Sequence, residues 1–196
     1  MRWLLAALLL LPLSALADNP RVELNTTLGR IVLELEADKA PVTVANFLGY
    51  VDSGFYDGTL FHRVIRDFMV QGGGFAEDHK IKPAGDPIHN EADNGLRNLR
   101  GTVAMARTPD PHSATAQFFI NTVDNRPLDH SAKTEQGWGY TVFGKVVEGM
   151  DVVDSIGNTR TGQRSLNGYP VPNVPLMPIL IESARRLPAA QPGKTP

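Results

Sequence analysis

The sequence predicts a mainly β protein, a closed β-barrel whose ends are plugged by helices. Several short segments alternate apolar and polar residues, whereas just two segments repeat apolar residues at helical spacing. Closing a sheet into a barrel removes exposed strand edges, which otherwise favour aggregation. The pattern does not fix the number of strands. With 196 residues and a hydrophobic fraction of 42%, the chain is expected to form one domain.

The folded region is predicted to begin with a β-hairpin followed by a helix. Apolar residues alternate with polar ones in residues 22–24 and again in residues 31–35, and residues 27–29 form a turn between them. The spacing of apolar residues then becomes that of a helix. Pro41 suits the first helical position, and Gly54 suits the C-terminal end.

The middle of the chain is predicted to alternate strands with long polar loops. Residues 61–72 return to strand character, and residues 102–105 and 118–122 form two further strands. Residues 76–100 are too rich in proline and glycine for regular structure. Because long loops in compact domains are often functional, this loop is expected to wall a binding groove. Residues 124–139 form a second polar loop.

The last third of the chain is predicted to contain a strand, a short helix, a loop and a closing strand. Residues 141–147 form the first strand, and the helix over residues 150–156 ends at Gly157. Residues 158–176 contain three prolines and are expected to form a loop. Residues 177–187 form the closing strand.

Residues 1–17 are predicted to be a secretory signal peptide. Arg2 precedes an apolar run over residues 3–13, and residues 15–17 (Ala-Leu-Ala) fit a cleavage site. The run is too short to span a bilayer. We therefore expect residues 18–187 to form the mature domain. This domain is expected to be exported to the periplasm and, after cleavage of the signal peptide, to have no association with the membrane. An uncleaved membrane anchor is the alternative.

The C-terminal residues are expected to be disordered, and the composition argues against nucleic-acid binding, disulfides and thiolate chemistry. Residues 188–196 contain three prolines, a glycine and no large apolar residue, so a disordered tail is expected. The formal net charge of −2 gives nothing that attracts nucleic acid, and the chain has no cysteine for disulfides or thiolate chemistry. A monomer is expected.

Metal, phosphate and hydrolase sites find little support in the motifs. The five histidines lack the spacing of metal ligands, and no serine lies in a Gly-x-Ser-x-Gly motif. Glycines 72–74 lack the lysine of a phosphate-binding loop, so they are interpreted as permitting a tight bend. No metal and no cofactor are expected.

Residues 61–75 contain the segment with the clearest chemistry. In an extended strand, Arg63, Met69 and Gln71 lie on the same face, and the irregular step at residues 66–67 is expected to let Phe68 join them. This face offers an apolar floor beside the forked donors of a guanidinium. Such a surface suits a neutral, partly apolar ligand such as a peptide.

This segment resembles the signature of cyclophilin-type peptidyl-prolyl isomerases. The resemblance rests on FHRVIRDFMVQGG at residues 61–73, followed in the family's order by GTVAMAR at 101–107, AQFFINT at 116–122 and VFGKV at 142–146. It extends from about residue 22 to residue 187. It implies a closed eight-stranded antiparallel β-barrel capped by two α-helices, and an isomerase that acts on proline-containing unfolded or folding polypeptides.

Isomerisation of an X-Pro bond needs neither nucleophile nor metal. The reaction breaks amide resonance, at a barrier of about 18–20 kcal/mol, and makes no new bond to a heavy atom. The catalyst must favour the twisted amide, in which the prolyl nitrogen regains a lone pair. Arg63 is the candidate donor to that nitrogen, as the resemblance also implies. Its charge is permanent and its donors are rigidly forked.

The resemblance also implies roles for other residues. Gln71 and the backbone at Ala106 and Arg107 match positions that hydrogen-bond the peptide. The remaining matched positions are the proline pocket of Phe68, Met69, Phe119 and Leu128, the groove residues Phe61, Gln117 and Tyr140, and the neighbour His62, to which no role is assigned. Phe118, of opposite parity to Phe119, is expected in the core.

Three departures from the better-known eukaryotic pattern affect substrate and drug binding, and the first is the segment Arg107-Thr108-Pro109-Asp110-Pro111-His112 that follows Ala106. An ungapped comparison places Pro127 where many members carry a tryptophan that packs on the inhibitor cyclosporin, and Tyr140 where they carry a groove histidine. These changes put peptide preference and drug binding in doubt. A non-catalytic chaperone or adaptor that holds proline-containing segments is the alternative function. Arg63 argues against it, because a binder gains nothing from a cation aimed at the amide nitrogen.

Overall fold

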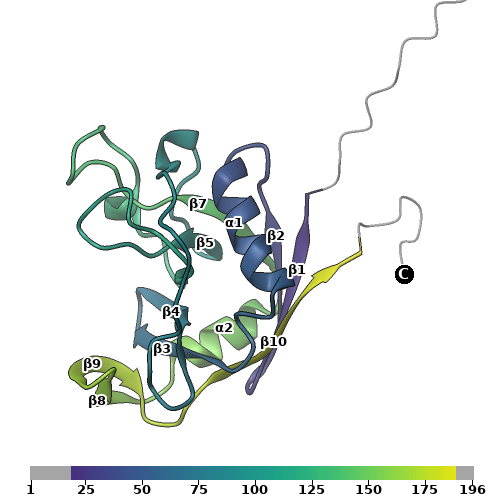
Figure 1. Cartoon of the computed structure of the whole chain (residues 1–196), viewed down its shortest axis with the longest axis vertical. Coiled ribbons are helices and arrows are strands. Elements are labelled where there is room, and N and C mark those ends of the chain that lie inside the picture. The colour runs from purple at the N-terminus through teal and green to yellow at the C-terminus, as the bar shows by residue number, and fades with distance from the viewer. Residues whose placement is uncertain (1–18, 189–196) are drawn as a thin grey trace, which may run out of the picture.

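The structure is a computed structural model that describes residues 19–188 (Figure 1). The predicted signal peptide and all but the first residue of the predicted tail lie outside the described residues. Within residues 19–188, no helix combines the length and apolar character needed to cross a membrane.

Eight strands form a closed antiparallel barrel. They are β1 (Arg21–Thr26), β2 (Gly29–Leu35), β3 (Thr59–Ile65), β4 (Met69–Ala76), β5 (Thr102–Met105), β6 (Phe118–Asn121), β7 (Val142–Glu148) and β10 (Leu180–Leu187). Around the barrel their order is β1-β10-β3-β4-β6-β5-β7-β2. Each predicted strand is present, and the predicted strand over residues 61–72 is a hairpin of β3 and β4.

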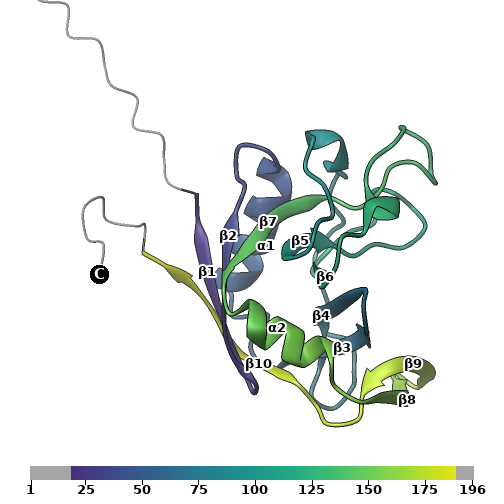
Figure 2. The same ribbon diagram turned by 180° about the vertical axis from the view of Figure 1, so that it is seen from behind.

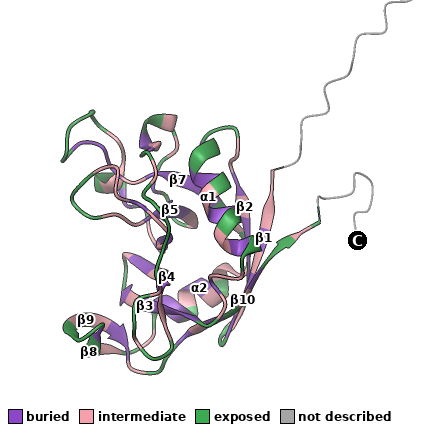
Figure 3. Ribbon diagram, in the orientation of Figure 1, coloured by how far each residue is buried: buried purple, intermediate pink, exposed green. Residues whose placement is uncertain are grey.

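Two α-helices, α1 (Pro41–Asp52) and α2 (Met150–Gly157), lie toward opposite ends of the barrel (Figures 1 and 2). Both predicted helices are confirmed. Buried and exposed residues alternate along α1 because one stripe of it, which includes Phe47, packs into the barrel core (Figure 3). α2 begins after Gly149, whose φ of 83° and close approach to the Arg30 carbonyl exclude a side chain.

Aromatic rings fill the barrel interior. Phe118 makes edge-to-face contacts with Phe47, Tyr56 and Phe61, at ring-centroid distances of 5.5, 5.5 and 6.2 Å. The buried Tyr56 hydroxyl donates to the Ala116 carbonyl at 2.8 Å, so its polar group is satisfied. Phe118 is thus a core residue, as its parity predicted.

The prediction of a loop over residues 158–176 is wrong, because these residues include a β-hairpin. β8 (Thr161–Leu166) and β9 (Tyr169–Pro175) pair in a separate two-stranded sheet. Asn167 and Gly168, both with positive φ, form the two-residue turn. The prolines suggested irregular structure, but a two-stranded ribbon has free edges on which proline costs no ladder hydrogen bond.

The long loop over residues 76–100 supports α1, and the prediction that it walls the binding groove is wrong, because none of its residues lines either hollow of the site described below. It includes a 3-10 helix, η1 (Ala92–Asn94). The Glu91 carboxylate accepts hydrogen bonds from the backbone N–H groups of Val42 and Thr43 at the start of α1. An acidic group at a helix N-terminus satisfies donors that have no partner within the helix. Leu96 packs beneath the apolar floor described below.

Candidate active site

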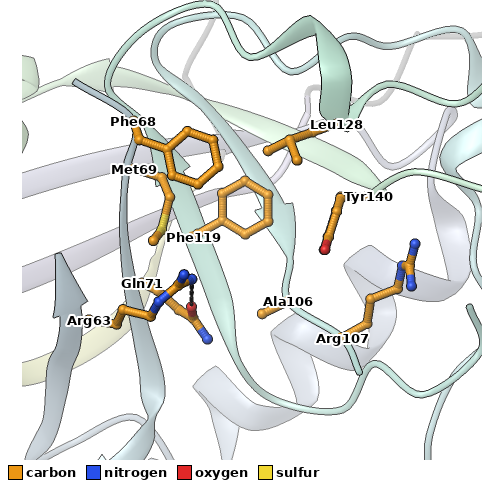
Figure 4. Close-up of a pocket in the computed structure, with 9 residues that line it drawn as sticks. All are labelled: Arg63, Phe68, Met69, Gln71, Ala106, Arg107, Phe119, Leu128 and Tyr140. Carbon is orange, nitrogen blue, oxygen red and sulfur yellow. Dashed lines mark hydrogen bonds between the residues drawn. The ribbon is translucent and has the colours of Figure 1, made fainter. Parts of the chain in front are cut away.

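Arg63 and Gln71 face each other across the β3–β4 hairpin. They are paired in the strand register, and Nη1 of Arg63 donates to Oε1 of Gln71 at 3.3 Å. The turn between the strands includes Asp67 with a φ of 54°, and it carries Phe68 toward the same side (Figure 4). The hairpin therefore places a cation, an amide and an aromatic ring around one hollow.

A bulge in β3 separates Arg63 from the barrel core. Phe61 pairs with Gly72 and Arg63 with Gln71, so two steps along β3 match one step along β4. The extra residue, His62, breaks the simple alternation of faces. Phe61 consequently points into the core cluster, whereas Arg63 lines the pocket.

The floor of the pocket is apolar and built from three segments. Met69 on β4 and Phe119 on β6 are 2% and 4% exposed, and Phe68 and Leu128 pack against the same small cluster. Leu128 comes from a second 3-10 helix, η2 (Arg126–Leu128), in the polar loop after β6. These surfaces form an apolar floor suited to a small apolar ring.

The far wall of the pocket consists of Tyr140 and Arg107. The Tyr140 ring meets Phe119 edge to face, at a centroid distance of 5.6 Å. The Arg107 guanidinium lies 4.7 Å from the Tyr140 ring centroid, and its Nε donates to the Gly139 carbonyl at 2.9 Å. Arg107 is therefore a fixed cation on the side of the pocket opposite Arg63 (Figure 4).

The structure brings nine of the predicted site residues together around this pocket, whose volume is about 100 Å³. They are Arg63, Phe68, Met69, Gln71, Ala106, Arg107, Phe119, Leu128 and Tyr140 (Figure 4). Gln117 lines an adjoining hollow that shares Gln71, Ala106 and Arg107 with the pocket. Phe61 and His62 line neither of the two.

His62 is 4% exposed and packs on Phe75 rather than lining the pocket. Burial, the largest effect, lowers the pKa of its imidazole from 6.5 to about 4. Its Nδ1 has no hydrogen-bond partner in the described part of the chain. His62 is consequently neutral at physiological pH and supplies no charge to the site.

Sequence reasoning missed three residues of the adjoining hollow, Thr108, Ser113 and Thr115. They lie in the segment between β5 and β6, where Thr108 donates from its backbone nitrogen to the Ser113 hydroxyl at 2.9 Å. Small hydroxyl residues in a loop carry no distinguishing pattern. Only the flanking motifs at residues 101–107 and 116–122 could have indicated that this segment lies against the groove.

Pro127 and Trp138 occupy different surroundings. Pro127 is exposed on η2, next to the pocket residue Leu128. Trp138 is 8% exposed, and its ring contacts the imidazoles of His112 and His130 at centroid distances of 5.0 and 5.4 Å. It does not line the pocket.

Comparison with known proteins gives the family. The family model described as "Cyclophilin type peptidyl-prolyl cis-trans isomerase/CLD" matches residues 21–184. The chain belongs to this family. A peptidyl-prolyl cis-trans isomerase of Streptomyces antibioticus is 63% identical over 166 residues, which cover 85% of this chain and 98% of that relative. Peptidyl-prolyl cis-trans isomerase B of Escherichia coli is 55% identical over 162 residues, covering 83% and 96%. This cyclophilin is therefore an isomerase.

Solved structures support the same fold. A crystal structure of a Cryptosporidium parvum cyclophilin-type peptidyl-prolyl cis-trans isomerase has a TM-score of 0.70 at 24% identity, covering 87% of this chain and 98% of that one. Another, in the presence of the dipeptide Ala-Pro, has a TM-score of 0.69 at 25% identity, covering 86% and 99%. The predicted eight-stranded antiparallel barrel with two helices is confirmed.

Proposed function

We propose that this isomerase accelerates the rotation of X-Pro bonds in unfolded or folding exported proteins, with Arg63 donating a hydrogen bond to the prolyl nitrogen. One observation carries the proposal: a guanidinium lies beside the apolar floor of a hollow of about 100 Å³. The hollow takes the proline ring, and the guanidinium then lies beside the bond that turns. The Ala-Pro dipeptide named for the Cryptosporidium parvum relative agrees with such a ligand.

A hydrogen bond from Arg63 can supply only part of the lowering of the activation free energy that catalysis requires. A hydrogen bond to a charged group is worth about 1.5–3 kcal/mol, whereas a millionfold acceleration needs about 8 kcal/mol. The balance must come from elsewhere in the site. Removing the amide from water over the Met69 and Phe119 floor disfavours the polar planar form, and Gln71 with the backbone at Ala106 holds one side of the bond while the other turns.

The assay that tests this role compares the wild-type domain with Arg63→Ala on a short X-Pro peptide. Arg63 makes one side-chain hydrogen bond in the described structure, so the variant should fold normally. We expect kcat/KM to fall at least tenfold. Arg164→Ala, at an exposed position on β8, is the matched control and should keep full activity.

The result separates catalysis from binding alone. A domain that binds the peptide but does not accelerate its isomerisation would be the non-catalytic chaperone or adaptor. Nearly full turnover by Arg63→Ala would remove the proposed role of the guanidinium.

The export part of the proposal rests on the apolar run near the N-terminus and its Ala-Leu-Ala site. We propose that cleavage after Ala17 releases the protein into the periplasm. N-terminal sequencing of the protein recovered from fractionated bacterial cells tests this, and a chain that keeps Met1 in the membrane fraction would contradict it.

A further inference from the structure

The groove is positively charged although the whole chain has a formal net charge of −2. The charged residues among the nine that line the pocket are Arg63 and Arg107, on opposite sides of the apolar floor (Figure 4). The adjoining hollow is lined by Arg107 together with hydroxyl and amide side chains, among them Ser113 and Gln117. No carboxylate of the described chain lines either hollow, so the cations lack a compensating charge within the groove.

Arg107 is held firmly by the protein. Its Nε donates to the Gly139 carbonyl, and its Nη1 donates to the carbonyls of Thr108 and Pro109 at 2.9 and 3.1 Å. The face of the guanidinium packs on the Tyr140 ring. A side chain already fixed in this way loses little further freedom when it binds a ligand. Among the residues that the structure describes, Nη2 of Arg107 donates to no acceptor, so it remains available.

Arg107 also lies where the two hollows meet. Gln71, Ala106 and Arg107 line both of them. A peptide whose proline fills the apolar pocket and whose next residues enter the adjoining hollow must pass this guanidinium. Hydrogen bonds between a guanidinium and a carboxylate are shorter and stronger than those between neutral groups. A passing glutamate or aspartate side chain can therefore gain a bond that an uncharged side chain cannot match.

We propose that Arg107 makes this isomerase select X-Pro segments that carry an acidic residue within two positions of the proline. The inference rests on the proposed function, since it assigns a substrate class to the same site. A lysine at the same peptide position would be repelled by Arg107 and by Arg63. Because the groove is open to solvent, the preference is sensitive to salt.

A peptide scan tests the selection. Each of the two positions before and after the X-Pro bond is filled in turn with Glu, Gln or Lys, and kcat/KM is measured at low salt and at about 0.5 M salt. We expect at least one position at which Glu exceeds Lys by about tenfold at low salt, with Gln between them, and a smaller ratio at high salt. Equal kcat/KM for Glu and Lys peptides at every position would overturn the proposal.

Variants then assign the preference to one side chain. Arg107→Glu should reverse the Glu/Lys order, and Arg107→Gln should bring the ratio close to one. Arg164→Glu changes the net charge by the same amount on exposed β8 and should keep the wild-type order. If Arg107→Glu does not fold, Arg107→Gln decides, and a wild-type ratio in that variant would overturn the proposal.

The Gln peptide separates this inference from the function on which it rests. Normal turnover of the Gln peptide with no Glu/Lys difference refutes the selection by Arg107 alone. If the Gln peptide is not turned over at all, the isomerase mechanism fails, and the selection fails with it.

Discussion

Gln71 turns its side-chain oxygen toward Arg63 and accepts a hydrogen bond from Nη1 at 3.3 Å. The orientation is fixed from the other side, because Nε2 of Gln71 donates to Oε1 of Gln117 at 2.9 Å. A flipped Gln71 amide would point its N–H groups at the guanidinium, which has donors and no acceptor. Gln117 thus acts through Gln71 to hold Arg63 at the edge of the pocket, which makes it a positioning residue.

Gly74→Ala should weaken catalysis without unfolding the domain. A Cβ at Gly74 would lie 2.5 Å from Cγ and Cδ of Gln117, so the Gln117 side chain must move and release Gln71. Moving the end of a flexible side chain costs little stability, but it frees the Gln71 amide to turn. We expect kcat to fall several-fold with KM changed less, measured on a short X-Pro peptide alongside the urea midpoint.

Gly49→Ala is the matched control for that variant. Gly49 lies in α1, and a Cβ there meets no atom within 4 Å. The substitution should stabilise the helix by about 0.5–1 kcal/mol and leave turnover unchanged. Wild-type kcat in Gly74→Ala would show that Gln117 does not position the pair.

The helices and the pocket floor were accessible from the sequence for different reasons. α1 has a proline at its first position and a buried stripe at helical period, and both are local signals. The pocket brings together Met69, Phe119 and Leu128, which are far apart along the chain, and only the family resemblance connected them. No pattern within one segment reports on a contact between β4, β6 and η2.

The β3 bulge explains why Phe61, which the resemblance assigned to the groove, lies in the core instead. By parity alone, Phe61 and Arg63 share a face, but the extra residue at His62 sends Phe61 into the core. The glycines at 72–74 also differ from their interpretation as a tight bend, because they continue β4. Gly73, with a φ of 79°, lets the strand pass close to Tyr56 and Phe118. Such bulges depend on cross-strand packing, which the sequence of one strand does not record.

His62 should make the fold less stable in acid. Burial lowers its pKa from 6.5 to about 4, so the unfolded chain binds a proton between these values and the folded chain does not. The stabilisation from neutral His62 is complete above pH 6.5 and is lost as pH falls toward 4. For each pH unit between the two pKa values, the free energy of unfolding falls by about 1.4 kcal/mol. The total loss is about 3 kcal/mol.

Urea unfolding of the wild type and His62→Gln at pH 7 and pH 4.5 measures this contribution. The other titrating groups are common to both proteins, so their effects cancel. We expect the wild type to lose about 2–3 kcal/mol more than the variant on going to pH 4.5. An equal loss in the two proteins would mean that His62 binds its proton as readily in the folded state as in the unfolded chain.

Turnover should be nearly flat from about pH 6 to pH 8 and insensitive to chelator. A guanidinium stays charged throughout this range, and His62 stays neutral because its pKa is about 4. The proposed mechanism moves no proton and uses no metal. The check is kcat/KM for a short peptide across this range, with and without EDTA. A steep change near pH 6.5 would implicate a histidine, and loss of activity with EDTA would implicate a metal.

Cyclosporin should inhibit this protein weakly. The tryptophan position of drug-sensitive relatives is expected at Pro127, which is exposed on η2 beside Leu128. Proline has neither a broad flat ring nor a side-chain donor. Loss of a central aromatic anchor costs about 2 kcal/mol or more, roughly thirtyfold in affinity. Pro127→Trp should recover much of that affinity while peptide turnover stays in the same range, because the Arg63 and Phe119 surfaces are unchanged.

Trp138→Ala distinguishes the two tryptophan alternatives. Trp138 is 8% exposed between His112 and His130 and does not line the pocket, so its removal should lower stability by about 3 kcal/mol or more and leave cyclosporin inhibition as weak as before. Inhibition constants for the wild type, Pro127→Trp and Trp138→Ala, measured side by side below the unfolding temperature of the least stable variant, test both statements. Tight inhibition of the wild type that disappears in Trp138→Ala would mean that the loop over residues 124–139 refolds on the drug and brings Trp138 to the pocket, and the assignment of Pro127 would then have to be abandoned.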